Sequence, residues 1–385
     1  MIYIVVLFLL FFLILKYDIK GSCSKETPDN NVWSLLLLVV LLSIPIFSYE
    51  MGSDIQNYKN WYNEEVKPLD SFSFNDFRYE PLFCLTISLF KTIGLSWFIV
   101  HGIIICFINI AVFFYGRKYV KPFYTFILLY FLLYFYEMNF EPIRQSIAMG
   151  IFLFSIPLME KRRFKAYLIW IGIAFGFHIS SFFALILLFS KRIKFNVLSY
   201  FVLFIILIIG NIVNSNFSNM IVFASLVGGD DYYEMYHNSD LVNNQLNING
   251  IIALLVLKVL PVIFSVKMIK AKCNIQSQHL ETAAFMLVFF MVLRAAIPLF
   301  DRFVLYWGVI HVVVIAEGLY IYNIPSKSLF VNYCLRIYFL ISFFIATFMY
   351  YIAENEYGFK NYRRFYPYSS VFEKQIDYDR RNKQL

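Results

Sequence analysis

The chain has 385 residues, of which 60% are hydrophobic and 15% are charged, and apolar runs recur along almost its whole length. This composition is typical of a polytopic membrane protein and leaves no stretch for a separate soluble domain. The formal net charge of +8 lies in short basic clusters between the apolar runs. Such clusters indicate loop anchors at a membrane and not a nucleic-acid partner.

Thirteen apolar segments predict an all-α, polytopic integral membrane protein with about 11–13 transmembrane or re-entrant helices. The first segment, 1–15, has no basic region before it and no cleavage site after it, so we expect a retained helix. Several segments are shorter than the roughly 20 residues of a full helical crossing, so some must be tilted, broken or re-entrant. The other segments are about 33–47, 82–93, 97–115, 123–136, 143–158, 166–177, 179–190, 197–213, 251–268, 282–299, 303–322 and 331–352.

The distribution of lysine and arginine predicts the topology. Between the second and third basic clusters lie only about 25 apolar residues, so the chain must enter the membrane and return, with His178 at the outer turn. The same reasoning places Glu141, Arg144 and Arg302 on the outer side. The four clusters, which we place on the cytoplasmic side, are 117–121, 161–165, 191–194 and 267–272.

We expect residues 1–352 to form one transmembrane domain with external loops at about 48–80 and 214–249, followed by a polar C-terminal tail, 353–385. The first loop is ambiguous. Its seven acids against three bases favour the outside, yet two full crossings before the next basic cluster would place it inside. Either 82–93 is a re-entrant half-helix or the loop is cytoplasmic. We favour the half-helix, because such backbone is tolerated where it lines a cavity.

The first loop carries candidate binding residues. Asp54 and Tyr58 lie four residues apart, so a helix would place both on one face, where they could contact a ligand. The alternative is a solvated surface helix at the membrane border, in which Trp61 and Tyr62 act as an aromatic anchor.

Two Glu-Pro pairs each open an apolar segment. Glu80 follows Arg78, and an acid at a helix start is favoured by the helix dipole without any function. Glu141 precedes the segment that holds Arg144 and Gln145, and Glu141 could pair with Arg144 at a spacing of three residues. One feature argues against a purely structural ion pair: Ala148, one helical turn after Arg144, is small and leaves room for a ligand beside the arginine. Ionisable groups in a membrane segment are functional candidates by default.

His178 is the histidine with the strongest functional signal. It is flanked by glycine, serine and phenylalanine at a predicted outer turn, and near neutral pH histidine is the natural proton acceptor. The alternative is a histidine that is only hydrogen-bonded within a helix. His101 and His311 fall in plain apolar surroundings, where a core position is favoured.

Arg294 and Arg302 flank a proline and a predicted external turn. Asp301 could neutralise Arg302 as a simple pair. Two more arginines on the face of Arg144 are nevertheless hard to explain by packing, because an unpaired guanidinium in a membrane is costly. An anionic ligand accounts for them. A pyrophosphate on a long lipid fits, because guanidinium groups bind phosphate oxygens in forked pairs and stabilise departing negative charge.

Six short motifs follow one another over nearly the whole chain. They are D-x-x-x-Y (Asp54, Tyr58), EP-L-F (Glu80 to Phe83), R-Q-x-x-A (Arg144, Gln145, Ala148), H-x-S (His178, Ser180), R-F-x-x-Y (Arg302, Phe303, Tyr306) and P-Y (Pro367, Tyr368). Their order and spacing resemble the EpsG family, whose members are polytopic proteins related to the Wzy-type O-antigen and capsule polymerases.

This resemblance implies a glycosyltransferase of the bacterial inner (cytoplasmic) membrane that polymerises a surface polysaccharide such as O-antigen, capsule or exopolysaccharide. It would join oligosaccharide repeat units carried on undecaprenyl pyrophosphate at the outer face. A hydroxyl at the non-reducing end of one unit would attack the anomeric carbon at the reducing end of the growing chain and release the lipid pyrophosphate. The implied fold is all-α, as in other membrane glycosyltransferases that use lipid-linked donors.

Under the same resemblance, each candidate residue has an expected role. Arg144 and Arg302, together with Arg294, would hold the pyrophosphate and ease its departure. His178 or Glu141 would take the proton from the attacking hydroxyl. The remaining candidates would bind the sugars: Asp54, Tyr58, Arg78, Glu80, Gln145 and, by stacking in the 214–249 loop, Tyr232, Tyr233 and Tyr236.

No cofactor is expected, and the five scattered cysteines without a CxxC pair indicate neither a disulfide framework nor a metal site. Expected partners are the lipid-linked oligosaccharide, membrane lipid, a chain-length regulator and a flippase. Three other functions stay open: a ligase that transfers finished polymer, a flippase or transporter for the lipid-linked sugar, and an acyltransferase that decorates sugars. A transporter often shows internal symmetry, and none is visible in the sequence.

Overall fold

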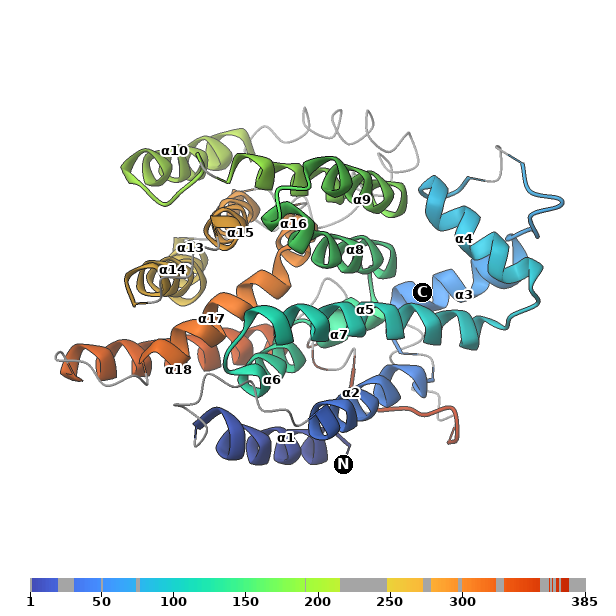
Figure 1. The fold of residues 1–385 in the computed structure, drawn as a ribbon, viewed down its shortest axis with the longest axis horizontal. Helices are drawn as coiled ribbons and strands as arrows, with labels where there is room; N and C mark the ends of the chain where they lie inside the picture. Colours follow the sequence, from blue (N-terminus) through green and yellow to red (C-terminus); the bar gives the residue numbers. More distant parts are fainter. Residues whose placement is uncertain are drawn as a thin grey trace. The chain divides into compact units, whose positions relative to one another are not determined.

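The computed structural model is a helical protein (Figure 1). Its described part contains no β-strand, only an isolated bridge between Ser48 and Ser370. Five helical stretches are long and apolar enough to cross a membrane, which confirms the prediction of an all-α, polytopic membrane protein. The structure describes residues 2–19, 31–49, 51–73, 77–190, 192–214, 248–272, 278–296, 300–322, 329–353, 360, 362, 365–366 and 368–373.

The chain divides into two compact units. The first comprises Met1–Leu188 together with Lys360–Leu385, and the second comprises Phe189–Phe359. Residues Lys360–Leu385 of the predicted tail are grouped with the first unit. The predicted 214–249 loop, with Tyr232, Tyr233 and Tyr236, lies outside the described residues except at its ends.

In the first unit, the predicted apolar segments form helices close to their expected bounds. Helix α8 packs between α5 and α9, while α2 packs on α5 and α1 packs on α6 (Figure 1). The helices are α1 (Ile2–Leu13, continued by a π-helical turn Ile14–Ile19), α2 (Asn31–Ile46), α3 (Ser53–Glu64), α4 (Pro81–Thr92), α5 (Trp97–Tyr119), α6 (Phe123–Leu133), α7 (Phe135–Phe140), α8 (Ile143–Glu160), α9 (Phe164–Phe177) and a 3-10 helix Ile179–Phe189.

The hairpin of α8 and α9 confirms the predicted pair of helices around a basic turn. The turn closes through Arg162, which adopts a left-handed φ of 56°. Because the two helices are antiparallel neighbours joined by a short turn, the start of α8 and the end of α9 lie at the same end of the hairpin. Arg144 and His178 occupy those two positions.

Helix α3 confirms that Asp54 and Tyr58 share a helix, and burial of its aromatic residues argues against the alternative of a solvated surface helix anchored by Trp61 and Tyr62. Trp61 and Tyr62 are only 4% and 2% exposed. The Tyr62 hydroxyl donates to the Leu95 carbonyl at 2.5 Å, and its ring packs against Trp97 with centroids 5.6 Å apart. These contacts bury the helix against the chain that enters α5.

Helix α4 has 12 residues, so it is about 18 Å long, shorter than the roughly 30 Å of a bilayer core. Its length supports the half-helix interpretation of segment 82–93. The preceding loop folds back along it: the Leu69 amide donates to Thr92 Oγ1 at 2.8 Å, and Lys91 Nζ donates to the Tyr62 carbonyl at 2.8 Å. At its other end Leu82 packs on Gly176 of α9, where a Cβ would lie 2.5 Å from the leucine side chain.

Gly52 and Phe140 fix α3 against α7. Gly52 caps the N-terminus of α3 with φ 81°, and a Cβ there would lie 2.3 Å from the Phe140 carbonyl oxygen. This close approach is open to glycine alone, because it lacks a Cβ and tolerates positive φ. It ties the helix of Asp54 and Tyr58 to the segment that leads into α8.

The C-terminal residues brace the same region. The Tyr49 amide donates to the Ser369 carbonyl and the Val371 amide to the Phe47 carbonyl, each at 2.9 Å. Phe365 is 4% exposed, and its ring stacks on Tyr136 of α7 with centroids 5.0 Å apart. The described part of the tail thus bridges the chain before α3 and helix α7.

The second unit contains two helices that the sequence predicted as continuous but that are interrupted. The 303–322 segment divides at Trp307, whose φ of −93° and ψ of 6° leave the helical range just before Gly308, a weak helix former. The 251–268 segment passes through a π-helical stretch. The elements are α10 (Val197–Asn214), α13 (Ile248–Leu254), the π-helix Leu255–Val259, α14 (Leu260–Lys272), α15 (Gln278–Ala296), α16 (Asp301–Tyr306), α17 (Gly308–Tyr322) and α18 (Leu329–Ile352).

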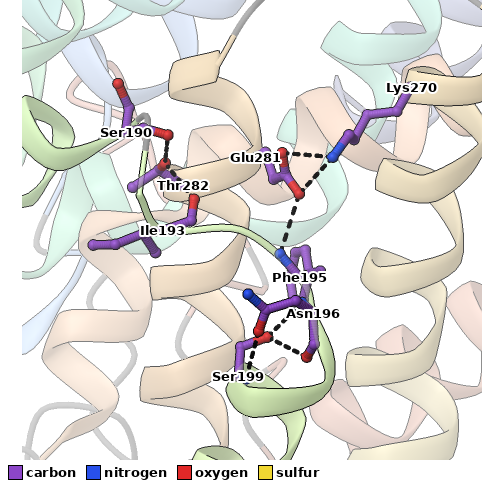
Figure 2. Close-up of polar contacts among 8 residues, drawn as sticks. All are labelled: Ser190, Ile193, Phe195, Asn196, Ser199, Lys270, Glu281 and Thr282. Atoms are coloured by element: carbon purple, nitrogen blue, oxygen red, sulfur yellow. Dashed lines mark hydrogen bonds and ion pairs between the residues drawn. The ribbon is translucent and has the colours of Figure 1, made fainter.

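One end of the second unit is organised by Glu281 at the start of α15 (Figure 2). Its carboxylate binds Lys270 Nζ at 2.8 Å through both oxygens and accepts the Phe195 amide at 3.1 Å. The neighbouring Thr282 donates to the Ile193 carbonyl at 3.1 Å. Glu281 thus joins the chain just after the third basic cluster to a lysine of the fourth, while their predicted placement on the cytoplasmic side stays a prediction.

Helix α10 begins just after Phe195, and two hydrogen bonds between Asn196 and Ser199 cap its N-terminus (Figure 2). Asn196 Oδ1 accepts the Ser199 amide at 2.8 Å, and Ser199 Oγ accepts the Asn196 amide at 2.8 Å. This arrangement satisfies two backbone groups that a helix start leaves without intrahelical partners.

We predict that Gly52→Ala destabilises the protein more than Gly94→Ala. Both glycines have positive φ, 81° and 78°, but a Cβ at Gly94 would meet nothing within 4 Å. Gly94→Ala should cost about 1–2 kcal/mol of backbone strain, and Gly52→Ala should add the clash with Phe140. Thermal unfolding midpoints of the purified proteins in detergent test this. Equal midpoints would show that the contact with Phe140 does not hold α3.

We also predict that Phe365→Ala lowers stability by roughly 3–5 kcal/mol, because it empties a buried aromatic site on α7. Tyr366→Ala is the matched control, since Tyr366 is 55% exposed and should change stability little. Limited proteolysis of the full-length protein measures both. If the two variants resist protease equally, the tail does not brace this unit.

Candidate functional site

A buried ion pair lies where α3, α4 and α8 meet in the first unit. Arg144 is the second residue of α8, and its Nε donates to the Tyr58 hydroxyl at 2.9 Å. Its Nη1 donates to the carboxylate of Glu80, the residue at the N-cap position of α4. The side chains of Arg144 and Glu80 are 12% and 19% exposed. Three predicted site residues are thus brought into direct contact.

Aromatic rings surround the Arg144 guanidinium. Its carbon lies 4.2 Å from the centroid of the Tyr79 ring, within the range of a cation–π contact. Tyr79 in turn meets Trp61 edge-on at 4.9 Å, and Trp61 stacks on Phe83 at 5.9 Å. These rings reduce the contact of the ion pair with water, which strengthens it.

Arg144 forms its ion pair with a carboxylate that is distant in the chain, Glu80, whereas a spacing of three residues had suggested Glu141. Glu141 is the C-cap of α7, is separated from α8 by Pro142, and is 8% exposed. Gln145 and Ala148 are 1% and 0% exposed, so that face of α8 is buried. The predicted space beside Arg144 stays a prediction.

Asp54 lies in the first turn of α3, one helical turn before Tyr58, and is half-buried. Within the described part of the chain it makes no hydrogen bond or ion pair. Burial raises the pKa of Tyr58, the charge of Arg144 lowers it, and the charge of Asp54 raises it. The Tyr58 hydroxyl therefore keeps its proton at neutral pH.

Arg78 lies at the edge of the cluster. It forms an ion pair with Glu65 at 2.6 Å, and the two side chains are 52% and 54% exposed. Its guanidinium carbon is 5.6 Å from the Tyr79 centroid, farther than that of Arg144. The prediction that Arg78 binds sugar stays a prediction.

His178 ends α9, at the same end of the α8–α9 hairpin as Arg144, and is 9% exposed. Its Nδ1 accepts the Ser180 amide at 3.2 Å and lies 2.8 Å from Ser180 Oγ. Because a backbone amide can only donate, Nδ1 must be unprotonated, and the neutral ring carries its proton on Nε2. In this tautomer Nε2 carries the proton, and the role of His178 as proton acceptor stays a prediction.

Arg294 and Arg302 belong to the second unit. The rings of Phe290, Phe300 and Phe303 pack together, with Phe290 and Phe303 stacked at 5.3 Å, and so hold the end of α15 against the start of α16. Arg294 lies near the end of α15 and is half-buried, while Arg302 is the second residue of α16 and is exposed. The two arginines thus share one end of this unit. Their predicted meeting with Arg144 stays a prediction.

Sequence reasoning missed a polar network behind the site. Asn109 Nδ2 donates to Asn139 Oδ1 at 2.7 Å, and the Tyr130 hydroxyl donates to Asn109 Oδ1 at 3.1 Å. His101 Nε2 lies 3.4 Å from the Asn139 carbonyl, so this histidine is a core residue with a polar neighbour. The sequence did contain a signal for this network, namely Asn109 and Asn139 among apolar residues, because buried side-chain amides need hydrogen-bond partners.

Sequence reasoning also missed Tyr79, although it stands between two predicted site residues. Its signal was an aromatic residue within the Arg-Tyr-Glu-Pro motif. No three His, Cys, Asp or Glu side chains come together as a metal site would require, as far as the described residues extend.

The fold and the site define a multi-pass helical membrane protein with a charged and aromatic cluster at the end of a helical hairpin. The chain belongs to the EpsG family, whose family model matches residues 30–370. This is a family of Wzy-like polysaccharide polymerases, as its resemblance in sequence implied. No match was found among curated proteins or among solved structures.

We predict that Glu80→Ala destabilises the protein more than Glu65→Ala. Removing Glu80 leaves a largely buried guanidinium without this partner and should cost roughly 1–3 kcal/mol. Glu65 belongs to an exposed pair, whose loss should cost about 1 kcal/mol or less. Thermal unfolding midpoints at low and high salt measure both. A larger loss for Glu65→Ala would show that the Arg144 pair does not stabilise the site.

Proposed function

We propose that the protein polymerises a bacterial surface polysaccharide by joining oligosaccharide repeat units carried on undecaprenyl pyrophosphate at the outer face of the inner membrane. Membership of a family of Wzy-like polymerases supports the reaction class. The observation that carries the proposal is the buried Arg144–Glu80 ion pair at the end of a membrane hairpin. Charges in such a place are costly, which supports a functional role for them.

In the proposed reaction, a sugar hydroxyl oxygen attacks the anomeric carbon of the lipid-linked donor. The bond between that carbon and the diphosphate oxygen breaks, and its electron pair leaves with the lipid diphosphate. The hydroxyl proton passes to a carboxylate. Of the two predicted acceptors, Glu141 is the better candidate, because the His178 tautomer presents a donor.

Arg302 and Arg294 are the proposed ligands of the diphosphate. They share one end of the second unit, where the Arg302 side chain is exposed. Forked guanidinium contacts would neutralise the charge that develops on the leaving diphosphate. His178 would donate Nε2–H to a sugar or phosphate oxygen.

A chromosomal deletion complemented with variants tests the proposal. The wild-type gene should restore a ladder of surface polysaccharide, whereas Arg144→Ala, Glu141→Gln and Arg302→Ala should leave a single repeat unit per carrier. Glu64→Gln, an exposed change on α3, is the control and should give a normal ladder. Immunoblots of tagged proteins verify equal amounts in the membrane.

Persistence of the ladder with all three variants would refute the assigned site. Accumulation of complete polymer on the carrier would instead indicate a ligase, and accumulation of repeat units on the inner leaflet would indicate a flippase.

A further inference from the structure

The charge around Arg144 does not suit a phosphate. Its positive charge is matched by Glu80, with which it is in direct contact. One more acid lies close in the fold, because the charge of Asp54 acts on Tyr58, which contacts Arg144. A diphosphate here would face two carboxylates and one guanidinium, so like-charge repulsion disfavours its binding.

The accessible part of the cluster has a different chemistry. Asp54, Tyr79 and Glu80 are half-buried, whereas Tyr58 and Phe83 lie buried against them. The accessible groups are therefore two carboxylates and one aromatic ring. A sugar presents the complementary groups, because its hydroxyls donate to carboxylates and its C–H faces pack on aromatic rings.

Tyr58 offers one more group of this kind. It is 5% exposed, and its hydroxyl oxygen accepts from Arg144 at 2.9 Å. Among the described residues, nothing accepts the proton of this hydroxyl. A buried donor without an acceptor is costly, and an oxygen of a bound sugar would satisfy it.

We infer that the cluster of Asp54, Tyr58, Tyr79, Glu80 and Arg144 binds the acceptor sugar and that the diphosphate binds elsewhere. Arg144 is then a positioning residue. It holds the Glu80 carboxylate and the Tyr58 hydroxyl at fixed points, and these groups contact the sugar hydroxyls. The inference rests on the proposed function and names the substrate of this site within it.

The test separates donor binding from acceptor use in the full-length protein reconstituted in nanodiscs. Radiolabelled undecaprenyl diphosphate measures binding of the leaving group. Transfer from a lipid-linked repeat unit to a soluble oligosaccharide of the same repeat measures kcat and KM for the acceptor. The variants are Arg144→Gln, Asp54→Asn and Glu80→Gln. The control is Glu64→Gln on α3, which removes one negative charge, as Asp54→Asn and Glu80→Gln do.

We expect Arg144→Gln, Asp54→Asn and Glu80→Gln to bind undecaprenyl diphosphate within twofold of the wild type. Their kcat/KM for the acceptor should fall at least about tenfold, as expected for loss of a charge-assisted hydrogen bond. Glu64→Gln should change neither quantity. Asp54→Asn keeps the inference testable if a variant of the ion pair fails to fold, because Asp54 has no hydrogen bond or ion pair among the described residues.

A tenfold or greater loss of diphosphate binding in Arg144→Gln, with acceptor KM unchanged in Asp54→Asn, would overturn the inference and make Arg144 a phosphate ligand. Failure of the wild type itself to bind undecaprenyl diphosphate or to extend the acceptor would overturn the proposed function and the inference with it. The two failures are distinguishable, because the second appears without any substitution.

Discussion

The ion pair of Arg144 and Glu80 is the interaction on which the first unit depends. It joins residues 64 positions apart in the chain, and the Arg144–Tyr58 bond joins residues 86 apart. A guanidinium at the end of a membrane helix must be neutralised, because its transfer from water costs several kcal/mol in the absence of a partner. The requirement draws the start of α4 and the middle of α3 onto the start of α8.

The rest of the unit keeps these groups in place. Gly52, close in the chain to Asp54, holds α3 against Phe140. Leu82, close to Glu80, holds the start of α4 against Gly176 of α9. The tail contributes from the C-terminal side, where a phenylalanine ring presses on α7. A site supported in this way has little freedom to reorganise, which favours recognition of a substrate of fixed shape.

The two units carry different polar chemistry. In the first, one arginine is matched by a carboxylate and lies among aromatic rings. In the second, Arg294 and Arg302 share one end beside a cluster of phenylalanine rings. The proposed reaction needs both kinds of surface, since its proposed acceptor is a sugar and its proposed leaving group is a diphosphate. The carboxylates of the first unit suit the proposed sugar, and the two arginines of the second unit suit the proposed diphosphate.

The membrane class, most helix bounds and the α8–α9 hairpin follow from the order of amino acids alone, because long apolar runs and basic turns act locally. The spacing of residues also placed Asp54 on the same helix as Tyr58 and selected Arg144 and Glu80. Three features needed the folded chain: the pairing of Arg144 with the distant Glu80, the burial of Trp61, and the return of Phe365 to α7. These contacts join positions far apart in the chain, and no local propensity or spacing distinguishes one distant carboxylate or cavity from another.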